Sequence, residues 1–252
     1  MIKKEFMEII SNKEIALDTF ELVLKNKYVS QAAGPGQFLH ISLPGHTLRR
    51  PISIASVDPD ACTVTTIFKV IGSGTKALSF CKEGEMIDVL GPGGNGFSLE
   101  NEAGSRILLV GGGIGVPPLY YLGKQLAAQG HKIVSVLGFQ NKESVFYEER
   151  FKEFGEVHIA TDNGSYGTKG FVTDVIGNIG EIDRYYTVGP IPMLRAVTEK
   201  LAGTPGYISL EERMGCGIGA CYACVIPLKG EEHGYRKICS EGPVFEANEV
   251  AL

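Results

Sequence analysis

The stretch "RILLVGGGIGVPP", from Arg106 to Pro118, decides the fold of this chain. The apolar run after Arg106 predicts a buried strand, and the glycines that follow predict a tight loop. Pro117 and Pro118 favour the first turn of a helix, and leucines recur after them at helical spacing. A strand that passes through a glycine loop into a helix is the opening of a parallel α/β sheet. The amino end of such a helix can also hold a phosphate group.

The same alternation of strand and helix continues to about residue 210. The sequence predicts further strands at "HKIVSVLGF", "EVHIAT", "RYYTVGP" and "GYISLEE". Between these strands it predicts helices over residues 145–154, 171–179 and 191–202. Apolar strands that alternate with helices are typical of a parallel sheet covered on both faces.

The first hundred residues follow a different pattern. Phe20, Leu22 and Leu24 alternate with other side chains, which is the period of a half-buried strand. Further short strands are predicted at "GQFLHISL", "CTVTTIFKV" and "GEMIDVLG", and turn residues separate them. This pattern predicts a β-barrel or sandwich. We therefore expect three units: a β domain over 1–100, an α/β domain over 101–210 and a small module over 211–252.

The last unit holds four cysteines in the pattern C-x4-C-x2-C-x14-C: Cys216, Cys221, Cys224 and Cys239. The spacing of the first three cysteines is that of plant-type [2Fe–2S] proteins, in which four thiolates hold two irons. Glycines and alanines between them allow a loop to turn sharply around a cluster. A structural zinc site, whose cysteines usually come as two short pairs, is the alternative. The spacing favours the iron–sulfur cluster over zinc or plain thiols.

The remaining cysteines and the histidines show no metal-binding pattern. Cys62 and Cys81 stand alone among apolar neighbours, so we expect both to be buried as small hydrophobic residues. The five histidines are scattered, and we interpret them as structural or surface groups: His40, His46, His131, His158 and His233.

Composition excludes several classes of function. The net charge is −5 and no long basic run occurs, so the chain has no electrostatic footprint for nucleic acid. The amino terminus lacks the apolar region of a signal peptide, and glycines and prolines interrupt the longest apolar run, at 107–122. These features predict a soluble, cytoplasmic protein that binds no membrane.

Two segments of the β domain are further candidates for phosphate binding. "LRRPISIAS" offers the guanidinium groups of Arg49 and Arg50 and the hydroxyl of Ser53, although the arginines could equally be solvated surface charges. "KVIGSGT" is either a hairpin turn or a phosphate cradle. The loop at 111–115 departs from the G-x-G-x-x-G fingerprint, because Val116 stands at the third glycine position.

Taken together, R-P-x-S, G-x-G-T and GGGIG-x-x-P resemble the ferredoxin–NADP reductase family. The cysteine motif and the ending "KICSEGPVFEANEV" narrow the resemblance to the electron transfer subunits of dihydroorotate dehydrogenase B. It implies a β-barrel with FAD, an α/β domain with a nicotinamide nucleotide and a [2Fe–2S] module. The FAD residues that it implies are Arg50, Pro51, Ile52, Ser53, Ile67, Phe68, Lys69, Gly74 and Thr75. For the nicotinamide nucleotide it implies Gly111, Gly112, Gly113 and Gly115, with 188–193 closing the site.

Three positions bear on specificity. Many members of the family carry an aromatic residue where this chain has Ile52, and a cysteine where it has Val188. Asp162, which follows the third strand of the α/β domain, would repel a 2′-phosphate and accept a hydrogen bond from a ribose hydroxyl. This favours NAD over NADP, and the alternative is that Asp162 only caps a turn.

The resemblance also implies a partner and a path. Dihydroorotate would be oxidised on a separate FMN-containing catalytic subunit, in a heterotetramer with two copies of each chain. Electrons would cross the cluster singly, reach FAD and leave as hydride to NAD⁺. We therefore expect no catalytic acid–base residue in this chain. The alternatives are a subunit of another NAD(P)H–ferredoxin-type or hydrogenase-linked reductase, or a zinc-stabilised binding protein.

Electron transfer requires the cluster to lie near its partner. We therefore predict that the cysteine loop lies at a subunit interface and exposes Ile218 and Tyr222. The alternative is that both side chains pack inward on the cluster.

Overall fold

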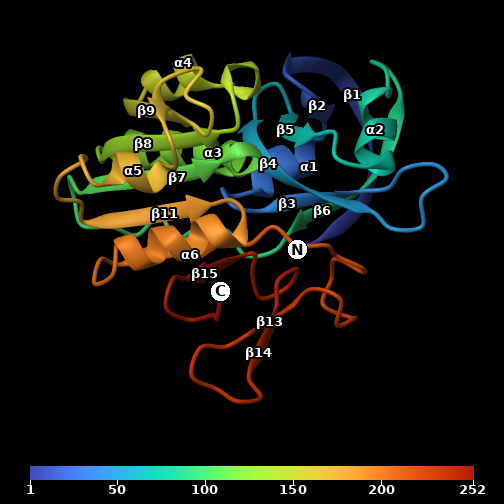
Figure 1. The fold of residues 1–252 in the computed structure, drawn as a ribbon. Helices are drawn as coiled ribbons and strands as arrows, with labels where there is room; N and C mark the ends of the chain where they lie inside the picture. Colours follow the sequence, from blue (N-terminus) through green and yellow to red (C-terminus); the bar gives the residue numbers. More distant parts are fainter.

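The computed structural model, which describes residues 1–252, contains a closed barrel, a seven-stranded sheet and a carboxy-terminal hairpin (Figure 1). The predicted fold class, a β-barrel joined to a parallel-sheet domain with a small cysteine-rich module, is confirmed.

The barrel has six antiparallel strands in the order β1-β2-β5-β4-β3-β6. Leu22 and Leu24 point into its core, as their alternation predicted, and meet Leu39 and Ile41 from β3 there. The barrel strands are β1 (Lys3–Ala16), β2 (Thr19–Lys25), β3 (Phe38–Ile41), β4 (Arg50–Asp58), β5 (Thr63–Lys69) and β6 (Met86–Gly93). Two short helices connect them, α1 (Lys27–Ala32) and α2 (Ser73–Ser79).

The segment "KVIGSGT" does not form a hairpin turn, because α2 begins at Ser73. The hydroxyl of Thr75 accepts hydrogen bonds from the backbone N–H groups of Ile71 and Gly72, at 3.0 and 3.3 Å. These two donors have no partner within the helix, so Thr75 fixes its first turn.

The sheet has the order β10-β9-β8-β7-β11-β12-β15 and is parallel except at β15. Its strands are β7 (Arg106–Gly112), β8 (Lys132–Phe139), β9 (Gly155–Thr161), β10 (Thr168–Lys169), β11 (Arg184–Val188), β12 (Gly206–Ser209) and β15 (Val244–Glu246). Its helical segments are η1 (Gly113–Gly115), α3 (Val116–Ala128), η2 (Lys142–Ser144), α4 (Glu148–Lys152), α5 (Val172–Ile176) and α6 (Ile191–Lys200).

Both faces of the sheet are covered, as predicted. Leu109 of β7 belongs to one hydrophobic cluster with residues of α3 and α4, whereas Leu108 belongs to another with residues of α5 and α6. The two helices predicted over 145–154 and 171–179 are shorter than expected. In the first, Tyr147 has a φ of 63°, and this left-handed residue sets the start of α4 at Glu148.

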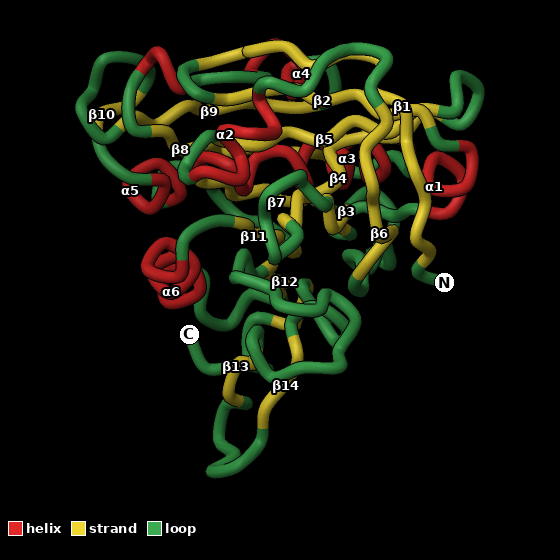
Figure 2. The backbone as a smooth tube through the Cα atoms, turned by 90° about the vertical axis from the view of Figure 1, so that its right-hand side faces the viewer, coloured by secondary structure: helices red, strands yellow, loops and turns green.

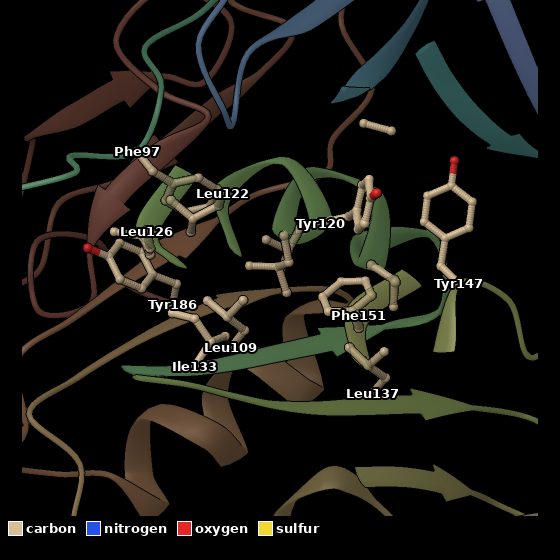
Figure 3. Close-up of a cluster of buried hydrophobic side chains, with 14 of the residues drawn as sticks. Phe97, Leu109, Tyr120, Leu122, Leu126, Ile133, Leu137, Tyr147, Phe151 and Tyr186 are labelled. Carbon is tan, nitrogen blue, oxygen red and sulfur yellow. The ribbon is translucent and has the colours of Figure 1, made fainter. Parts of the chain in front are cut away.

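Helix α3 lies between the sheet and the barrel. The cluster in Figure 3 gathers Leu122 and Tyr120 of α3 with Leu109 and Leu137 of the sheet, and its members include Ala55 and Ile67 of the barrel. On the other side of α3, the Tyr121 hydroxyl donates a 2.9 Å hydrogen bond to the carbonyl of Ala33. The barrel and the sheet therefore share one apolar core through this helix.

The carboxy-terminal segment extends below both domains as the hairpin of β13 (Val225–Pro227) and β14 (Tyr235–Lys237) (Figure 2). After the hairpin the chain returns, and β15 pairs antiparallel with β12. Its hydrophobic cluster includes Phe38 of the barrel, Leu194 of α6 and two of the motif cysteines. No helix of the structure is long and apolar enough to span a bilayer.

Candidate cofactor sites

The four motif cysteines meet in one place. A loop after β12 carries Cys216, Cys221 and Cys224, and the end of β14 returns Cys239 to them. Their thiols lie as two neighbouring pairs, Cys216 with Cys221 and Cys224 with Cys239. Cys224 and Cys239 are buried, and Cys216 and Cys221 are half-buried.

The loop directs backbone N–H groups at these sulfurs. The N–H of Cys221 donates to Sγ of Cys216 at 3.3 Å, and the N–H of Gly219 donates to Sγ of Cys239 at 3.2 Å. Gly219 has a φ of 81°, a conformation that glycine adopts without strain. The positive φ of Gly219 thus allows the loop to point its backbone N–H groups toward the sulfurs.

These donors shift the pKa of the thiols unequally. Burial opposes ionisation of Cys216, but backbone hydrogen bonds, that of Ile218 foremost, outweigh it and lower its pKa to about 6. Burial, together with the neighbouring Cys224, raises the pKa of Cys239 to about 12. A bound metal must ionise every thiol that ligates it. Four converging thiols with inward N–H donors fit an iron–sulfur cluster, whose sulfurs accept such bonds.

The surface of this loop is apolar. Ile218 is 52% exposed and Tyr222 is 65% exposed, so the alternative in which both pack inward is wrong. The Lys237 ammonium lies 4.4 Å from the centre of the Tyr222 ring and donates to the carbonyl of Gly219 at 2.7 Å. Lys237 thus supports both the loop backbone and its exposed tyrosine.

The prediction that Cys62 and Cys81 are buried is wrong, because both are only half-buried. Cys62 occupies a left-handed position with a φ of 55°, in the turn between β4 and β5. Apolar neighbours in the sequence indicated a strand interior, whereas the turn brings the side chain to the surface.

The two arginines of "LRRPISIAS" have different surroundings. Arg49 donates both Nη2 hydrogen bonds to the carboxylate of Asp88 at 2.9 Å, and its Nη1 reaches the carbonyls of His40 and Asp88. Its guanidinium is therefore occupied within the barrel. Arg50 instead covers the start of α2, where a methyl group on Gly74 would lie 2.2 Å from its Nε.

The other barrel residues fall into two groups. The side chains of Ile52, Ile67 and Phe68 are buried in hydrophobic clusters. Pro51 and Ser53 alternate with Ile52 along β4 and are half-buried, so they lie on the other face of the strand. Lys69, at the end of β5, lines a large cavity.

This cavity has a volume of about 540 Å³ and lies at the carboxyl ends of the parallel strands. In sheets of this kind ligands bind at that edge, at the strand where the chain changes direction, which here is β7. Of the predicted nucleotide residues, Gly112, Gly113 and Asp162 line the cavity. The lining also includes Pro190, Pro192 and Met193, from the segment predicted to close the site.

Two glycines shape the loop beside the cavity. Gly113 has a φ of 53° and open space where a side chain would stand. Gly115 touches β11 so closely that a methyl group on it would lie 2.2 Å from the carbonyl oxygen of Val188. Gly111 packs instead on α3, through Val116 and Leu119.

The carboxylate of Asp162 does not cap the turn after β9. That turn is closed by Asn163, whose side-chain oxygen accepts a 2.9 Å hydrogen bond from the N–H of Ser165. Asp162 is exposed at the cavity wall. Its carboxylate is therefore available to a ligand.

The sequence analysis missed several residues of the cavity wall. Glu211 follows β12, and its exposed side chain lines the cavity. Its place just after a parallel strand was the signal that could have identified it. The other missed residues are Thr19, Ile114, Gly138, Phe139, Gln140, Ser144, Phe146, Gly170, Phe171, Val172, Thr173 and Ala196.

Comparisons with known proteins agree with this geometry. Residues 211–251 match the family model described as the iron–sulfur cluster binding domain of dihydroorotate dehydrogenase B. A solved structure of an NADH-dependent reduced ferredoxin–NADP oxidoreductase superposes with a TM-score of 0.89 at 36% identity, covering 97% of this chain and 89% of that chain.

Two curated relatives match over their full lengths. The chain is 52% identical to the dihydroorotate dehydrogenase B (NAD(+)) electron transfer subunit of Bacillus cereus strain B4264, with 100% of both chains covered. It is 53% identical to the corresponding subunit of Bacillus caldolyticus, again with 100% of both covered. The chain therefore belongs to the family of dihydroorotate dehydrogenase B electron transfer subunits.

Proposed function

We propose that this chain transfers electrons from a dihydroorotate dehydrogenase catalytic subunit to NAD⁺, through a [2Fe–2S] cluster and FAD, in pyrimidine biosynthesis. It is an oxidoreductase subunit, and its cofactors are FAD, the [2Fe–2S] cluster and NAD. The observation that carries this proposal is the match of about 52% identity over the full length of both chains. The four converging cysteines support it.

FAD exchanges two electrons with a nicotinamide as hydride and single electrons with an iron–sulfur cluster, so it can link the two. In our proposal Cys216, Cys221, Cys224 and Cys239 hold the cluster. The two thiol pairs suit two irons with two thiolates each. The N–H groups of Gly219 and Cys221 stabilise the charge on the sulfurs.

The barrel residues would position FAD. The guanidinium of Arg50 beside Gly74 supplies positive charge where the diphosphate would bind. Since the side chains of Ile52, Ile67 and Phe68 are buried, these residues would contact the flavin mainly through the backbone. The other residues proposed to position FAD are Pro51, Ser53, Lys69 and Thr75.

The nicotinamide nucleotide would occupy the cavity at the carboxyl ends of β7, β8 and β9. Gly111, Gly112, Gly113 and Gly115 let the backbone approach its phosphates, and Asp162 accepts a hydrogen bond from its ribose. Asp162 favours NAD because its negative charge repels a 2′-phosphate. Within this chain no residue is proposed as an acid or base for dihydroorotate.

Membership of the family implies a catalytic-subunit partner. We further propose that the partner carries FMN and that two copies of each chain assemble. The units would be 1–100 for FAD, 101–210 for NAD and 211–252 for the cluster. A cytoplasmic location suits thiols that must stay reduced to ligate iron.

A second candidate function is that of an NADH-dependent ferredoxin–NADP-type oxidoreductase subunit. The superposition with such an enzyme, at a TM-score of 0.89, favours it. The two functions share the cofactor sites and differ in the partner, so the partner must be identified directly.

The test is to purify the tagged full-length chain from its own host without oxygen and to add dihydroorotate and NAD⁺. We expect dihydroorotate-dependent formation of NADH and a co-purifying dehydrogenase subunit. A coloured protein that NADH reduces but that ignores dihydroorotate would support the second candidate. A colourless protein containing zinc would contradict both.

A further inference from the structure

His40 is buried at the junction between the barrel and the cysteine loop. It lies on β3, its side chain has no exposed surface, and neither ring nitrogen has a hydrogen-bond partner. A neutral imidazole has one N–H donor and one acceptor, and burying both without partners is unfavourable. This histidine therefore has a binding capacity that the protein alone does not use.

The alternation of β3 decides where the ring points. Leu39 and Ile41 enter the core of the barrel, so Phe38 and His40 lie on the opposite face of the strand. Phe38 belongs to the hydrophobic cluster that contains Cys224 and Cys239. Its ring meets that of His40 edge to face, with the ring centres 6.3 Å apart. His40 thus faces the cysteine module.

The ring also touches the loop that carries the first three cysteines. A methyl group on Gly217 would lie 2.2 Å from Nδ1 of His40, so only a glycine fits at the position that follows Cys216. Gly217 has a φ of 72°, which likewise favours glycine there. The loop therefore admits the imidazole against the backbone of Gly217, the residue that follows Cys216.

The ring is uncharged at neutral pH. Burial, reinforced by the nearby Arg49, lowers the pKa of His40 to about 4. A neutral ring can sit beside a cluster without adding net charge, and it still offers one N–H.

We propose that His40 donates a hydrogen bond to a sulfur of the bound [2Fe–2S] cluster and thereby raises the reduction potential of that cluster. Such bonds stabilise the more negative, reduced cluster and so favour its reduction. The backbone N–H groups of Gly219 and Cys221 already donate to sulfurs from the loop side. His40 supplies a donor from the barrel side. The inference rests on the proposed function, because it requires the cluster.

The experiment compares redox titrations of the cluster, followed by electron paramagnetic resonance, in the full chain with its cofactors bound. His40→Leu removes the donor and His40→Asn retains one. We expect the reduced-to-oxidised ratio at the wild-type midpoint to fall about tenfold in His40→Leu, equivalent to about 59 mV for one electron. The loss should be smaller in His40→Asn, and the FAD potential should not change.

The matched control is His131→Leu. His131 is also buried and also has an unpartnered ring nitrogen, but it precedes β8 in the sheet domain. Its replacement should leave the cluster potential unchanged. If His40→Leu shifts the FAD potential and not the cluster potential, His40 serves the flavin and the proposal is wrong.

A second measurement detects the hydrogen bond directly in the wild-type protein. Wild-type protein labelled with ¹⁵N-histidine should show a weak nitrogen coupling to the reduced cluster in pulsed resonance spectra. The coupling should disappear in His40→Asn and persist in His131→Asn. A normal cluster signal without any histidine coupling overturns the role of His40 alone, whereas absence of a [2Fe–2S] signal overturns the proposed function as well.

Discussion

At the scale of single residues, the cysteines differ in what surrounds them rather than in their chemistry. Cys239 is 2% exposed and paired with Cys224 inside a hydrophobic cluster, whereas Cys81 is half-buried and hydrogen-bonds only a backbone carbonyl. A buried thiol with a second thiol and an N–H donor at its sulfur is suited to a metal. An isolated half-buried thiol is not.

Replacing Cys239 by serine is therefore expected to remove most of the cluster. Serine is a poorer ligand for this cluster than cysteine, because iron–sulfur clusters prefer the soft thiolate to a hydroxyl oxygen. Iron and acid-labile sulfide per chain should fall to a small fraction of the wild-type content. Cys81→Ser is the matched control and should retain both. Equal iron content in the two variants would place the cluster elsewhere.

Asp162 sets the choice of nucleotide if it binds the ribose. Asp162→Ser should lower the preference for NADH over NADPH in kcat/KM by about tenfold to a hundredfold, because a hydrogen bond to a charged group contributes about 1.5–3 kcal/mol. The measurement is the reduction of an artificial acceptor by each nucleotide. Asp60→Ser, in an exposed turn between β4 and β5, is the control and should not alter the ratio. An unchanged ratio in Asp162→Ser would remove this residue from the nucleotide site.

At the scale of elements, the glycine loop is a packing device as well as a phosphate candidate. Gly115 immediately precedes α3 and packs against the end of β11. The carbonyl group of Val188 occupies the space that a side chain on Gly115 would need. The amino end of α3 can lie against the sheet only because this residue has no Cβ.

Gly115→Ala should therefore destabilise the fold by about 1–3 kcal/mol, since the clash is with backbone atoms that cannot rotate away. Urea unfolding followed by circular dichroism would measure the change. Gly34→Ala is the control because Gly34 has open space around it, and a small stabilisation is expected there. If both variants unfold at the wild-type midpoint, the contact between Gly115 and Val188 is weaker than the structure indicates.

Elements with a clear period were predictable from the sequence. Alternating leucines marked β2, and apolar runs between helices marked β7, β8 and β11. Elements that depend on a few backbone angles, or on pairing with a strand far away in the sequence, were not predictable. The left-handed Tyr147 shortens α4, and the three residues of β15 form a strand only because β12 lies beside them. Short elements of this kind carry no period to detect.

The residues of the candidate sites likewise include some that the sequence predicted and some that it did not. The cysteine spacing predicted which thiols come together, because that spacing is set by the local geometry of the loop. Glu211 and Phe171 reach the cavity from segments far apart in the sequence, and no motif joins them. His40 looked like a structural residue, since only the fold brings it against Gly217.

At the scale of the whole molecule, the three parts are held together by shared cores. Helix α3 joins the barrel to the sheet, and β15 ties the carboxy-terminal segment to β12. Phe38 of the barrel enters the hydrophobic cluster of the cysteine module. The cysteine loop is therefore held against both domains, while its side chains Ile218 and Tyr222 remain exposed. Figure 2 shows that the carboxy-terminal segment extends below the two domains. A partner can approach the exposed side chains without rearranging the core.

This arrangement predicts that Ile218 and Tyr222 contact the catalytic subunit. Replacing both by alanine should raise the dissociation constant for that subunit by at least about tenfold, because a tyrosine buried at the centre of an interface often carries a large share of the binding energy. Surface plasmon resonance with the purified catalytic subunit would measure the constant. Iron content and the visible spectrum would show that the variant keeps its cluster.

The control removes equally exposed apolar side chains from another surface. Phe6 and Met86, on β1 and β6, are 64% and 58% exposed, and their replacement by alanine should leave the dissociation constant unchanged. Electron transfer over a short distance requires the partner to cover the cluster, so loss of binding should accompany loss of dihydroorotate-dependent NADH formation. If the Ile218→Ala/Tyr222→Ala variant binds as tightly as the wild type with its cluster intact, the interface lies on a different face of the molecule.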